Sequence, residues 1–229
     1  MQLSVIIPIY NDSAAIKSML PQLRSSLSKA QIIVVDGGSE DGGPEWLLKQ
    51  AGVELIRSAQ AGRAFQMNVG AREASGSALL FLHADTTLSP GACADLESVL
   101  HNDEVKAGAF RFRLDGQGRF YRAVEWMVKQ RVKFLRMPYG DQGLFIRRSL
   151  FESLQGFPEL PLLEDLALVD AIKQQTTLYS FPGAAITSAR KWEEYGKYKV
   201  MFTNFITILA FRLGFSPLKL QKFRNNCFK

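Results

Sequence analysis

Apolar runs alternate with amphipathic segments through the first hundred residues. Four runs are short and apolar, as expected of buried strands, and the first two of them are rich in β-branched side chains: residues 5–9, 32–36, 53–56 and 78–82. Between them, apolar positions recur at helical spacing or follow a helix-start signal: residues 16–27, the segment from Pro44, 62–74 and 90–100. This alternation predicts an α/β fold, a Rossmann-like, mostly parallel sheet flanked by helices.

The second half is less regular. Residues 109–113 alternate like a strand with one wet face, and residues 120–133 have helical spacing. Shorter elements should follow: a strand at 144–146, a helix at 166–174, two strands at 178–181 and 185–187, and a final helix at 195–213. We therefore expect one α/β unit with a C-terminal helical segment.

Polar side chains collect where the first, second and fourth strands end. These residues are Tyr10, Asn11, Asp36, Gly37, His83, Ala84 and Asp85. Ligands of open α/β sheets bind beyond the carboxyl ends of the strands, so these residues mark the expected site.

Asp85 is a candidate ligand for Mg²⁺ or Mn²⁺, because such a carboxylate leaves other metal positions to phosphate oxygens. His83 lies two residues earlier, on the same face of the strand, and could add a nitrogen ligand, which Mn²⁺ accepts more readily than Mg²⁺. The alternative for His83 is a strand-end histidine that bonds to backbone.

Asp36 occupies the same position on the second strand. It could accept a hydrogen bond from a ribose hydroxyl or a base N–H, or it could simply hold the Gly38–Ser39 turn. No G-x-G-x-x-G motif follows the first strand, and no Walker-type phosphate loop is present. A nicotinamide, flavin or P-loop site is therefore disfavoured.

Charge is concentrated at the C-terminal end. The chain has 229 residues and a net charge of +6, while residues 190–229 carry nine basic and two acidic side chains. A basic tail of this kind indicates an anionic partner, such as a membrane surface or a diphosphate, and less readily a nucleic acid. The alternative is a helical face that is simply exposed to solvent. The two cysteines form no disulfide framework, and the first residues form no signal peptide, so we expect a cytoplasmic location.

The apolar stretch 200–213 is shorter than the ~20 residues that a membrane span needs. It could lie in a membrane interface, with nearby lysines and arginines at the headgroups, as a peripheral contact on the inner face of the membrane. Alternatively, it packs on the domain or on a second subunit of a homodimer, since aromatic stripes are more often buried than lipid-facing.

Taken in order, the motifs of the chain resemble those of family 2 glycosyltransferases, which have the GT-A fold. Residues 5–11, 34–41 and 80–85 resemble the three donor-site motifs, residues 140–142 the acceptor loop, Glu164–Asp165 the catalytic base, and residues 188–192 a late basic-Trp motif. The resemblance covers about residues 3–195 and is strongest for a small bacterial branch whose metal motif reads His-Ala-Asp.

The resemblance implies direct displacement with inversion at the anomeric carbon, with Asp165 rather than Glu164 as the base. A divalent cation at Asp85 and His83 would bind the diphosphate of a nucleotide sugar, with a UDP- or GDP-sugar as the natural donor. The donor-binding residues implied are Pro8, Tyr10, Asn11, Asp36, Gly37, Arg63, Asn68, Ala84, Arg190 and Lys191. Asn68 would pin a loop, and Arg190 and Lys191 would close over the diphosphate.

Gly140, Asp141, Gln142 and Trp192 would bind the acceptor, Trp192 by stacking on a sugar face. The acceptor is unknown, with a lipid-linked one as a candidate. From the residues alone, 140–142 could instead be an ordinary turn with no role in acceptor binding, and Glu164 and Asp165 could cap a helix instead of acting in catalysis. The implied organisation is a domain at 1–190, with a nucleotide-sugar half (1–100) and an acceptor half (101–190), and a basic, aromatic helical tail at 191–229.

Two positions depart from the family pattern. His83 stands where typical members have Asp, and Gly37 stands where they have a second Asp. In addition, no histidine follows His101 to supply a late metal ligand. The altered metal motif leaves a competing function open, a non-catalytic nucleotide-sugar-binding protein. A nucleotidyltransferase is disfavoured because residues 10–13 lack its glycine-rich basic loop, and nothing besides the tail suggests nucleic acid.

Overall fold

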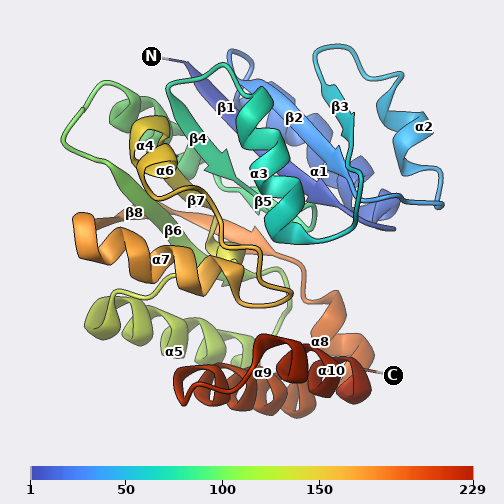
Figure 1. Cartoon of the computed structure of the whole chain (residues 1–229), viewed down its shortest axis with the longest axis vertical. Helices are drawn as coiled ribbons and strands as arrows, with labels where there is room; N and C mark the ends of the chain where they lie inside the picture. Colours follow the sequence, from blue (N-terminus) through green and yellow to red (C-terminus); the bar gives the residue numbers. More distant parts are fainter. Residues whose placement is uncertain (1, 229) are drawn as a thin grey trace.

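The computed structural model describes residues 2–228, which build one mixed sheet covered by helices (Figure 1). The strands are β1 (Leu3–Ile9), β2 (Gln31–Asp36), β3 (Glu54–Arg57), β4 (Ala78–Phe81), β5 (Thr86–Leu88), β6 (Ala107–Leu114), β7 (Leu144–Arg147) and β8 (Leu178–Thr187). Their order is β3-β2-β1-β4-β7-β6-β8-β5. The first four are mutually parallel, β7 runs antiparallel to both neighbours, and β6 and β8 are parallel.

The helices follow the predicted alternation in the first half. They are α1 (Ser13–Ser26), α2 (Gly43–Leu47), α3 (Arg63–Glu73), α4 (Pro90–Leu100), α5 (Arg119–Leu135), α6 (Arg148–Ser153), α7 (Glu164–Gln175), α8 (Arg190–Tyr195), α9 (Lys197–Arg212) and α10 (Pro217–Cys227). A single 3₁₀ turn, η1 (Gly140–Gln142), stands where the sequence predicts a turn.

Two apolar cores lie on opposite faces of the sheet. In β1, Val5 and Ile7 pack with α1 and α4, whereas Ile6 points to the other face, where α3, α6 and α7 pack. The alternation of side chains along a strand produces this division. Both faces of β1 are therefore buried, which explains its continuous apolar run.

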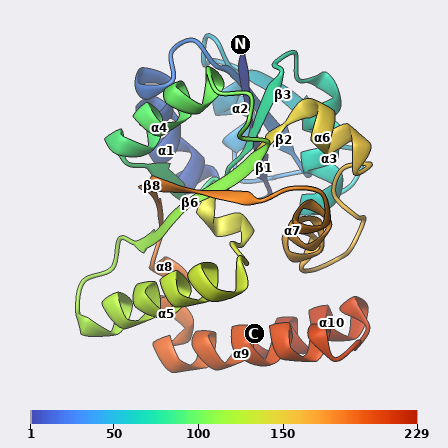
Figure 2. The same cartoon turned by 90° about the vertical axis from the view of Figure 1, so that its left-hand side faces the viewer.

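A separate helical layer forms the side of the molecule away from the N-terminal strands. Helices α5, α9 and α10 lie there, below the sheet and α7 (Figures 1 and 2). A third apolar cluster joins this layer to the sheet through Phe112 and Leu114 of β6 and Tyr121 and Val124 of α5. Within the described part of the chain, no helix combines the length and apolarity required to cross a membrane.

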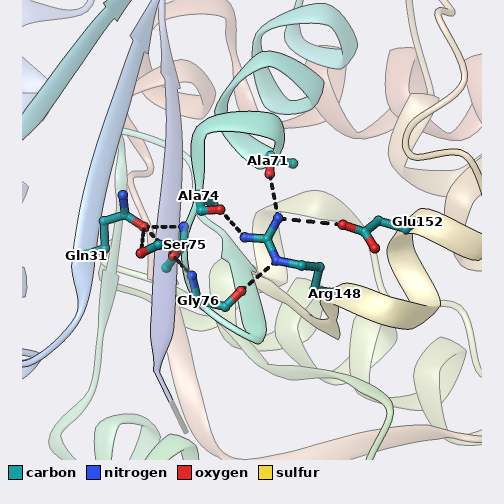
Figure 3. A network of polar contacts seen from close by, with 8 residues as sticks. Gln31, Ala71, Ala74, Ser75, Gly76, Arg148 and Glu152 are labelled. Carbon is teal, nitrogen blue, oxygen red and sulfur yellow. Dashed lines mark hydrogen bonds and ion pairs between the residues drawn. The ribbon is translucent and has the colours of Figure 1, made fainter.

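Arg148 ties the end of α3 to the start of α6 (Figure 3). Its guanidinium donates to three backbone carbonyls, those of Ala71 (3.2 Å), Ala74 and Gly76 (2.8 Å), and lies 3.6 Å from Glu152. A cation at the carboxyl end of a helix satisfies carbonyls that have no partner within the helix. Arg148 thus holds the turn between α3 and β4 from one side, while Gln31 Oε1 accepts from Ser75 N over 2.8 Å and Ser4 Oγ accepts from Gly76 N over 2.9 Å.

Three predicted elements differ in the structure. Residues 178–181 and 185–187 belong to one strand, β8, because its pairing with β6 passes over Pro182 and Gly183 through an irregularity. The final helix is broken at Gly196, whose φ of 89° ends one helix before the next begins. Strand β5, a three-residue edge strand, and the helices α6, α8 and α10 were not predicted.

Candidate functional site

The carboxyl ends of β1, β2 and β4 meet at one edge of the sheet. Ile9 pairs with Asp36 at the ends of β1 and β2, and Gly37 N donates to Ile9 O over 2.9 Å. Leu82 N donates to Ile6 O over 3.0 Å, so residues 83–85 continue from β4 at this same edge. Tyr10, Asp36 and Asp85 therefore follow neighbouring strands, as the sequence predicts.

Gln66 fastens this edge and was missed by sequence reasoning. Its side chain, only 2% exposed, donates to the carbonyls of Ile9 (2.8 Å) and Val35 (2.7 Å), and its Oε1 accepts from Gly62 N. A Cβ on Gly37 would lie 3.0 Å from Gln66 Oε1 and 3.2 Å from Ala61 Cα. The space of the missing second Asp is thus occupied, which accounts for glycine there.

The predicted nucleotide residues line the ends of β1 and β2. Pro8 is buried, whereas the Tyr10 ring is 56% exposed beside the edge. Asn11, with a φ of 49°, donates from its N–H to the Ser39 hydroxyl. The buried carboxylate of Asp36 accepts from the backbone of Gly38 and Ser39, so without ligand it holds the turn. The exposed Tyr10 ring is thus accessible to a ligand, and the turn after β2 is held by Asp36.

Asn68, predicted at the donor site, bonds elsewhere. Its amide donates to Phe157 O over 2.8 Å, and its Oδ1 accepts from Phe157 N over 2.9 Å. Both polar atoms of the side chain thus pin the loop between α6 and α7. The structure therefore places Asn68 as a support of that loop, with no polar atom left to aim at the strand ends.

Asp85 and His83 leave β4 together, on either side of the buried Ala84. Asp85 Oδ1 accepts from the Thr86 hydroxyl over 3.3 Å, and its carbonyl accepts from Ser188 N. Burial and then the Arg63 charge lower the pKa of His83, while Asp85 and Asp165 oppose them. The imidazole is therefore neutral, which is the form that binds a metal.

The described residues contain no group of three or more acidic, histidine or cysteine side chains placed to hold a metal ion. One carboxylate and one neutral imidazole nevertheless fit a cation that takes its other ligands from water and phosphate, as Mg²⁺ and Mn²⁺ do at nucleotide sites. The donor set at Asp85 and His83 thus suits a cation that arrives with a diphosphate.

The predicted acceptor loop and base lie beside this pair. Gly140 N donates to Asp165 Oδ2 over 2.6 Å, and Leu166 N donates to Asp165 Oδ1 over 2.8 Å. A Cβ on Gly140 would come within 3.1 Å of both Asp165 Oδ2 and His83 Nε2. The loop, the carboxylate and the imidazole therefore converge, and Gly140 has no room for a side chain.

Gln142 fixes this loop from beneath. It is 2% exposed, and its amide donates to Phe110 O while its Oε1 accepts from Arg131 and Tyr139 N. An amide committed in this way positions the loop and offers no free group to an acceptor. We therefore revise its predicted contact with the acceptor to a supporting role.

Glu164 and Arg63 form an ion pair at the same site. Nε of Arg63 lies 2.8 Å from Oε1 of Glu164, whose side chain is 2% exposed, whereas that of Arg63 is 41% exposed. Burial raises the pKa of Glu164, and the Arg63 charge opposes this rise. Glu164 thus orients Arg63 at the mouth of the site.

Asp141 carries a buried carboxylate oxygen, Oδ1, that has no hydrogen-bond partner among residues 2–228. Burial raises the pKa of Asp141 to about 6; the Arg131 charge opposes the rise, and the charges of Asp165 and Asp85 add to it. An unpaired buried acceptor is costly, so this atom is suited to a donor or a cation supplied by a ligand.

Four cations border the acidic residues, three of them from the C-terminal segment. Arg190 pairs with Asp12 over 2.8 Å, while Arg63 is held by Glu164. The other two, Lys191 and Arg224, face the ring of Phe228, and neither forms an ion pair with a carboxylate of residues 2–228. Arg224 lies near enough to Arg63 and Asp165 for their charges to affect its pKa, which burial lowers.

Arg224 was missed by sequence reasoning, because no motif in the tail marks it. Trp192, predicted to stack on a sugar, instead packs edge-on against Phe120 with ring centroids 5.9 Å apart. Trp192 lies on α8 and is partly buried against the apolar cluster formed by β6 and α5, so its ring supports the helical layer.

Residues 4–154 match Glycosyl transferase family 2, which is more than half of the chain. The chain belongs to this family. An uncharacterised glycosyltransferase of Haemophilus influenzae is 32% identical over 226 residues, 96% of this chain and 66% of that protein. A probable glycosyltransferase of Bacillus subtilis, YdaM, is 26% identical over 96% of this family 2 chain and 59% of its own length.

Glycosyltransferase AglE of Haloferax volcanii is 36% identical over 91 residues, 36% of this chain and 30% of that protein. The family 2 chain thus spans between about a third and two thirds of the length of these relatives.

Solved structures share the fold. The mannosyltransferase PcManGT from Pyrobaculum calidifontis, in complex with GDP-Man and Mn²⁺, superposes with a TM-score of 0.66 at 17% identity, covering 98% of this chain and 68% of that one. TarS of S. aureus (residues 1–349), in complex with UDP-GlcNAc, gives 0.64 at 18% identity, covering 82% and 58%. The α/β fold of the family 2 chain is therefore GT-A-like.

Proposed function

We propose that this chain transfers a sugar from a nucleoside-diphosphate sugar to an acceptor hydroxyl, with inversion at the anomeric carbon. One observation carries the proposal: the carboxylate of Asp165, held by two backbone N–H groups, faces the His83–Asp85 strand end and a border of cations. This arrangement supports a role for Asp165 as the base, for Asp85 as a metal ligand and for the cations as partners of a diphosphate. Structural neighbours that bind UDP-GlcNAc and GDP-Man support a uridine or guanosine donor.

In this reaction the acceptor oxygen attacks the anomeric carbon as the bond from that carbon to the diphosphate oxygen breaks. Asp165 accepts the proton of the hydroxyl, and the nucleoside diphosphate leaves. Lys191 and Arg224, which pair with no carboxylate in the described part of the chain, bind the diphosphate, while Tyr10 and Asp36 border the nucleoside. Asp141, with its unpaired oxygen, faces the acceptor side.

Asp85 and His83 would hold a divalent cation, Mn²⁺ or Mg²⁺, which when bound neutralises charge on the departing diphosphate. The Mn²⁺ present in the complex of PcManGT supports this assignment. The proposed setting is the bacterial cytoplasm, in the branch marked by His83–Ala84–Asp85, and the free state of Cys93 and Cys227 is consistent with a reducing compartment. A lipid-linked acceptor belongs to this proposal as well.

The test begins with a thermal-shift screen of nucleoside diphosphates and nucleotide sugars, with and without Mn²⁺. For the donor that binds, we measure release of nucleoside diphosphate by the wild type and by Asp165→Asn. Loss of a general base lowers turnover by about 10²–10⁴-fold. The control is Asp103→Asn, an exposed aspartate distant in the chain from these motifs.

Normal turnover by folded Asp165→Asn would show that the base is wrongly assigned. Donor binding without any release of nucleoside diphosphate, in the presence of Mn²⁺ and candidate acceptors, would instead favour a non-catalytic nucleotide-sugar-binding protein.

A further inference from the structure

Helix α9 has its polar side turned inward. The side facing the body of the protein contains Val200, Thr203 and Thr207, all buried, and the Thr207 hydroxyl donates to Thr203 O within the helix. A surface helix in water normally buries its apolar stripe and exposes its polar one. The reversed arrangement indicates that the outward side of α9 meets something other than water.

A strip of exposed apolar side chains follows the outward side of α9 and is extended by further exposed apolar side chains on the turn after it and on α10. Its members, which we call the outer face, are Tyr198, Phe202, Phe205, Ile206, Leu209, Leu213, Phe215, Leu218 and Phe223, all between 38% and 69% exposed. Aromatic side chains have ~150–250 Å² each to bury, so the four most exposed aromatics alone present roughly 500 Å². With the aliphatic members added, the strip exceeds the largest apolar patch usual on a monomer.

Charge is strongly polarised toward this layer. Residues 119–136 carry six basic and one acidic side chain, and residues 190–229 carry nine basic and two acidic ones, a net of +12 in a chain of +6. The remainder of the chain is therefore at −6. Four exposed lysines, Lys197, Lys199, Lys219 and Lys222, belong to the same two helices as the outer face.

The distribution of charge decides which of two partners covers the outer face, a second copy of the chain or a lipid surface. A second copy joined by a twofold axis would bring two outer faces together with their lysines, so like charges would oppose each other. An anionic lipid surface satisfies both features, because aromatic and aliphatic side chains enter the headgroup boundary while lysines meet lipid phosphates.

We propose that the outer face of α9 and α10 binds the surface of an anionic lipid bilayer. The proposal concerns docking alone and does not depend on the reaction at Asp165. Vesicle binding is measured without donor or acceptor, so failure of this proposal and failure of the proposed function are separate results.

The experiment is sedimentation of the full-length protein with vesicles of phosphatidylcholine alone, or with about a third phosphatidylglycerol. One variant, Phe202→Ser/Phe205→Ser, removes two apolar anchors, and we expect its partition coefficient to fall at least tenfold. A second, Lys199→Gln/Lys219→Gln/Lys222→Gln, should lose roughly 100-fold on anionic vesicles, about fivefold per lysine. Raising the salt concentration should weaken wild-type binding in the same direction.

Two matched controls lie in the N-terminal half. Leu48→Ser alters a leucine that is 68% exposed, and Lys17→Gln/Lys29→Gln/Lys49→Gln removes three exposed lysines. Both controls should bind vesicles like the wild type, and light scattering should report the same mass for every variant.

Absence of binding to anionic vesicles, or equal binding to neutral ones, would overturn the proposal. Equal losses in the controls would also overturn it, because binding would then follow net charge and not the outer face. A dimer that dissociates in Phe202→Ser/Phe205→Ser, without vesicle binding by the wild type, would assign this face to a second copy.

Discussion

At the scale of single residues, the two adjacent acids at the start of α7 are in different environments. Glu164 is buried against Arg63, so its charge is already used within the protein. Asp165 receives two backbone N–H groups, which orient the carboxylate without adding a competing side-chain cation. The structure thus gives a physical reason to prefer Asp165 as the proposed base, where spacing alone could not choose.

Residues at the strand ends could be predicted because each directly follows an apolar run. Gln66 and Arg224 could not, since their partners are distant in the chain: Gln66 bonds the carbonyls of Ile9 and Val35, and the charge of Asp165 acts on the pKa of Arg224. Periodicity identifies which side of a helix is apolar, but it does not show which remote carbonyl or charge a polar side chain will meet.

Lys191 provides a pH test of the proposed diphosphate contact. Burial and the nearby charges of Arg224 and Arg63 lower the pKa of Lys191 to about 8. Its ammonium therefore loses its charge as the pH rises through 8, and affinity for a nucleoside diphosphate should fall between pH 7 and 9. Isothermal titration calorimetry measures this, and Lys191→Arg, which stays charged, should retain its affinity at pH 9.

Lys191→Gln should bind more weakly at pH 7 and show no further loss by pH 9. A wild-type affinity that is constant over this interval, or one that falls equally in Lys191→Gln, would show that the diphosphate does not meet this ammonium.

At the scale of elements, the buried strands and the helices between them follow from apolar period alone. One failure occurs where proline and glycine do not end a strand as they usually do. Proline and glycine normally interrupt a strand, yet β8 continues through Pro182 and Gly183. Glycine is needed there because α4 packs directly on the strand, and a Cβ on Gly183 would collide with the backbone of Ala92. The parallel pairing of β6 with β8 is equally invisible in the sequence, because it joins segments that are not neighbours in the chain.

Arg148 carries a prediction on stability at this scale. Arg148→Leu should lower the free energy of unfolding by about 2–4 kcal/mol. Up to three carbonyls lose charged hydrogen bonds, which contribute about 1.5–3 kcal/mol each. Water compensates part of this loss, because the position is partly exposed. Urea unfolding followed by circular dichroism measures it.

The matched control for this change is Arg72→Leu, on the exposed side of the same helix, α3, which should change stability by no more than about 0.5 kcal/mol. Equal losses in the two variants would show that the carbonyl contacts of Arg148 contribute nothing beyond an ordinary surface arginine.

At the scale of the whole molecule, the C-terminal layer belongs to the site as well as to the outer face. Helix α10 is seated by Leu220, which is 5% exposed, and by Gln221, which donates to Pro161 O. From this seat, Arg224 and Phe228 approach Lys191 and the acidic residues. The predicted division at residue 190 therefore separates acidic residues on one side from basic residues on the other that lie close together in the fold. That residues 191–229 form an independent unit stays a prediction.

Two leucines of α10 separate these roles. Leu220→Asp should unseat the helix and withdraw Arg224, so affinity for a nucleoside diphosphate should fall about tenfold or more, the loss of one charged contact. Leu218→Asp, two residues away on the outer face and 61% exposed, should leave that affinity unchanged while weakening vesicle binding. Calorimetry and sedimentation on the same preparations measure both. If folded Leu220→Asp binds the diphosphate as tightly as Leu218→Asp does, then α10 contributes nothing to the donor site and Arg224 does not contact the diphosphate.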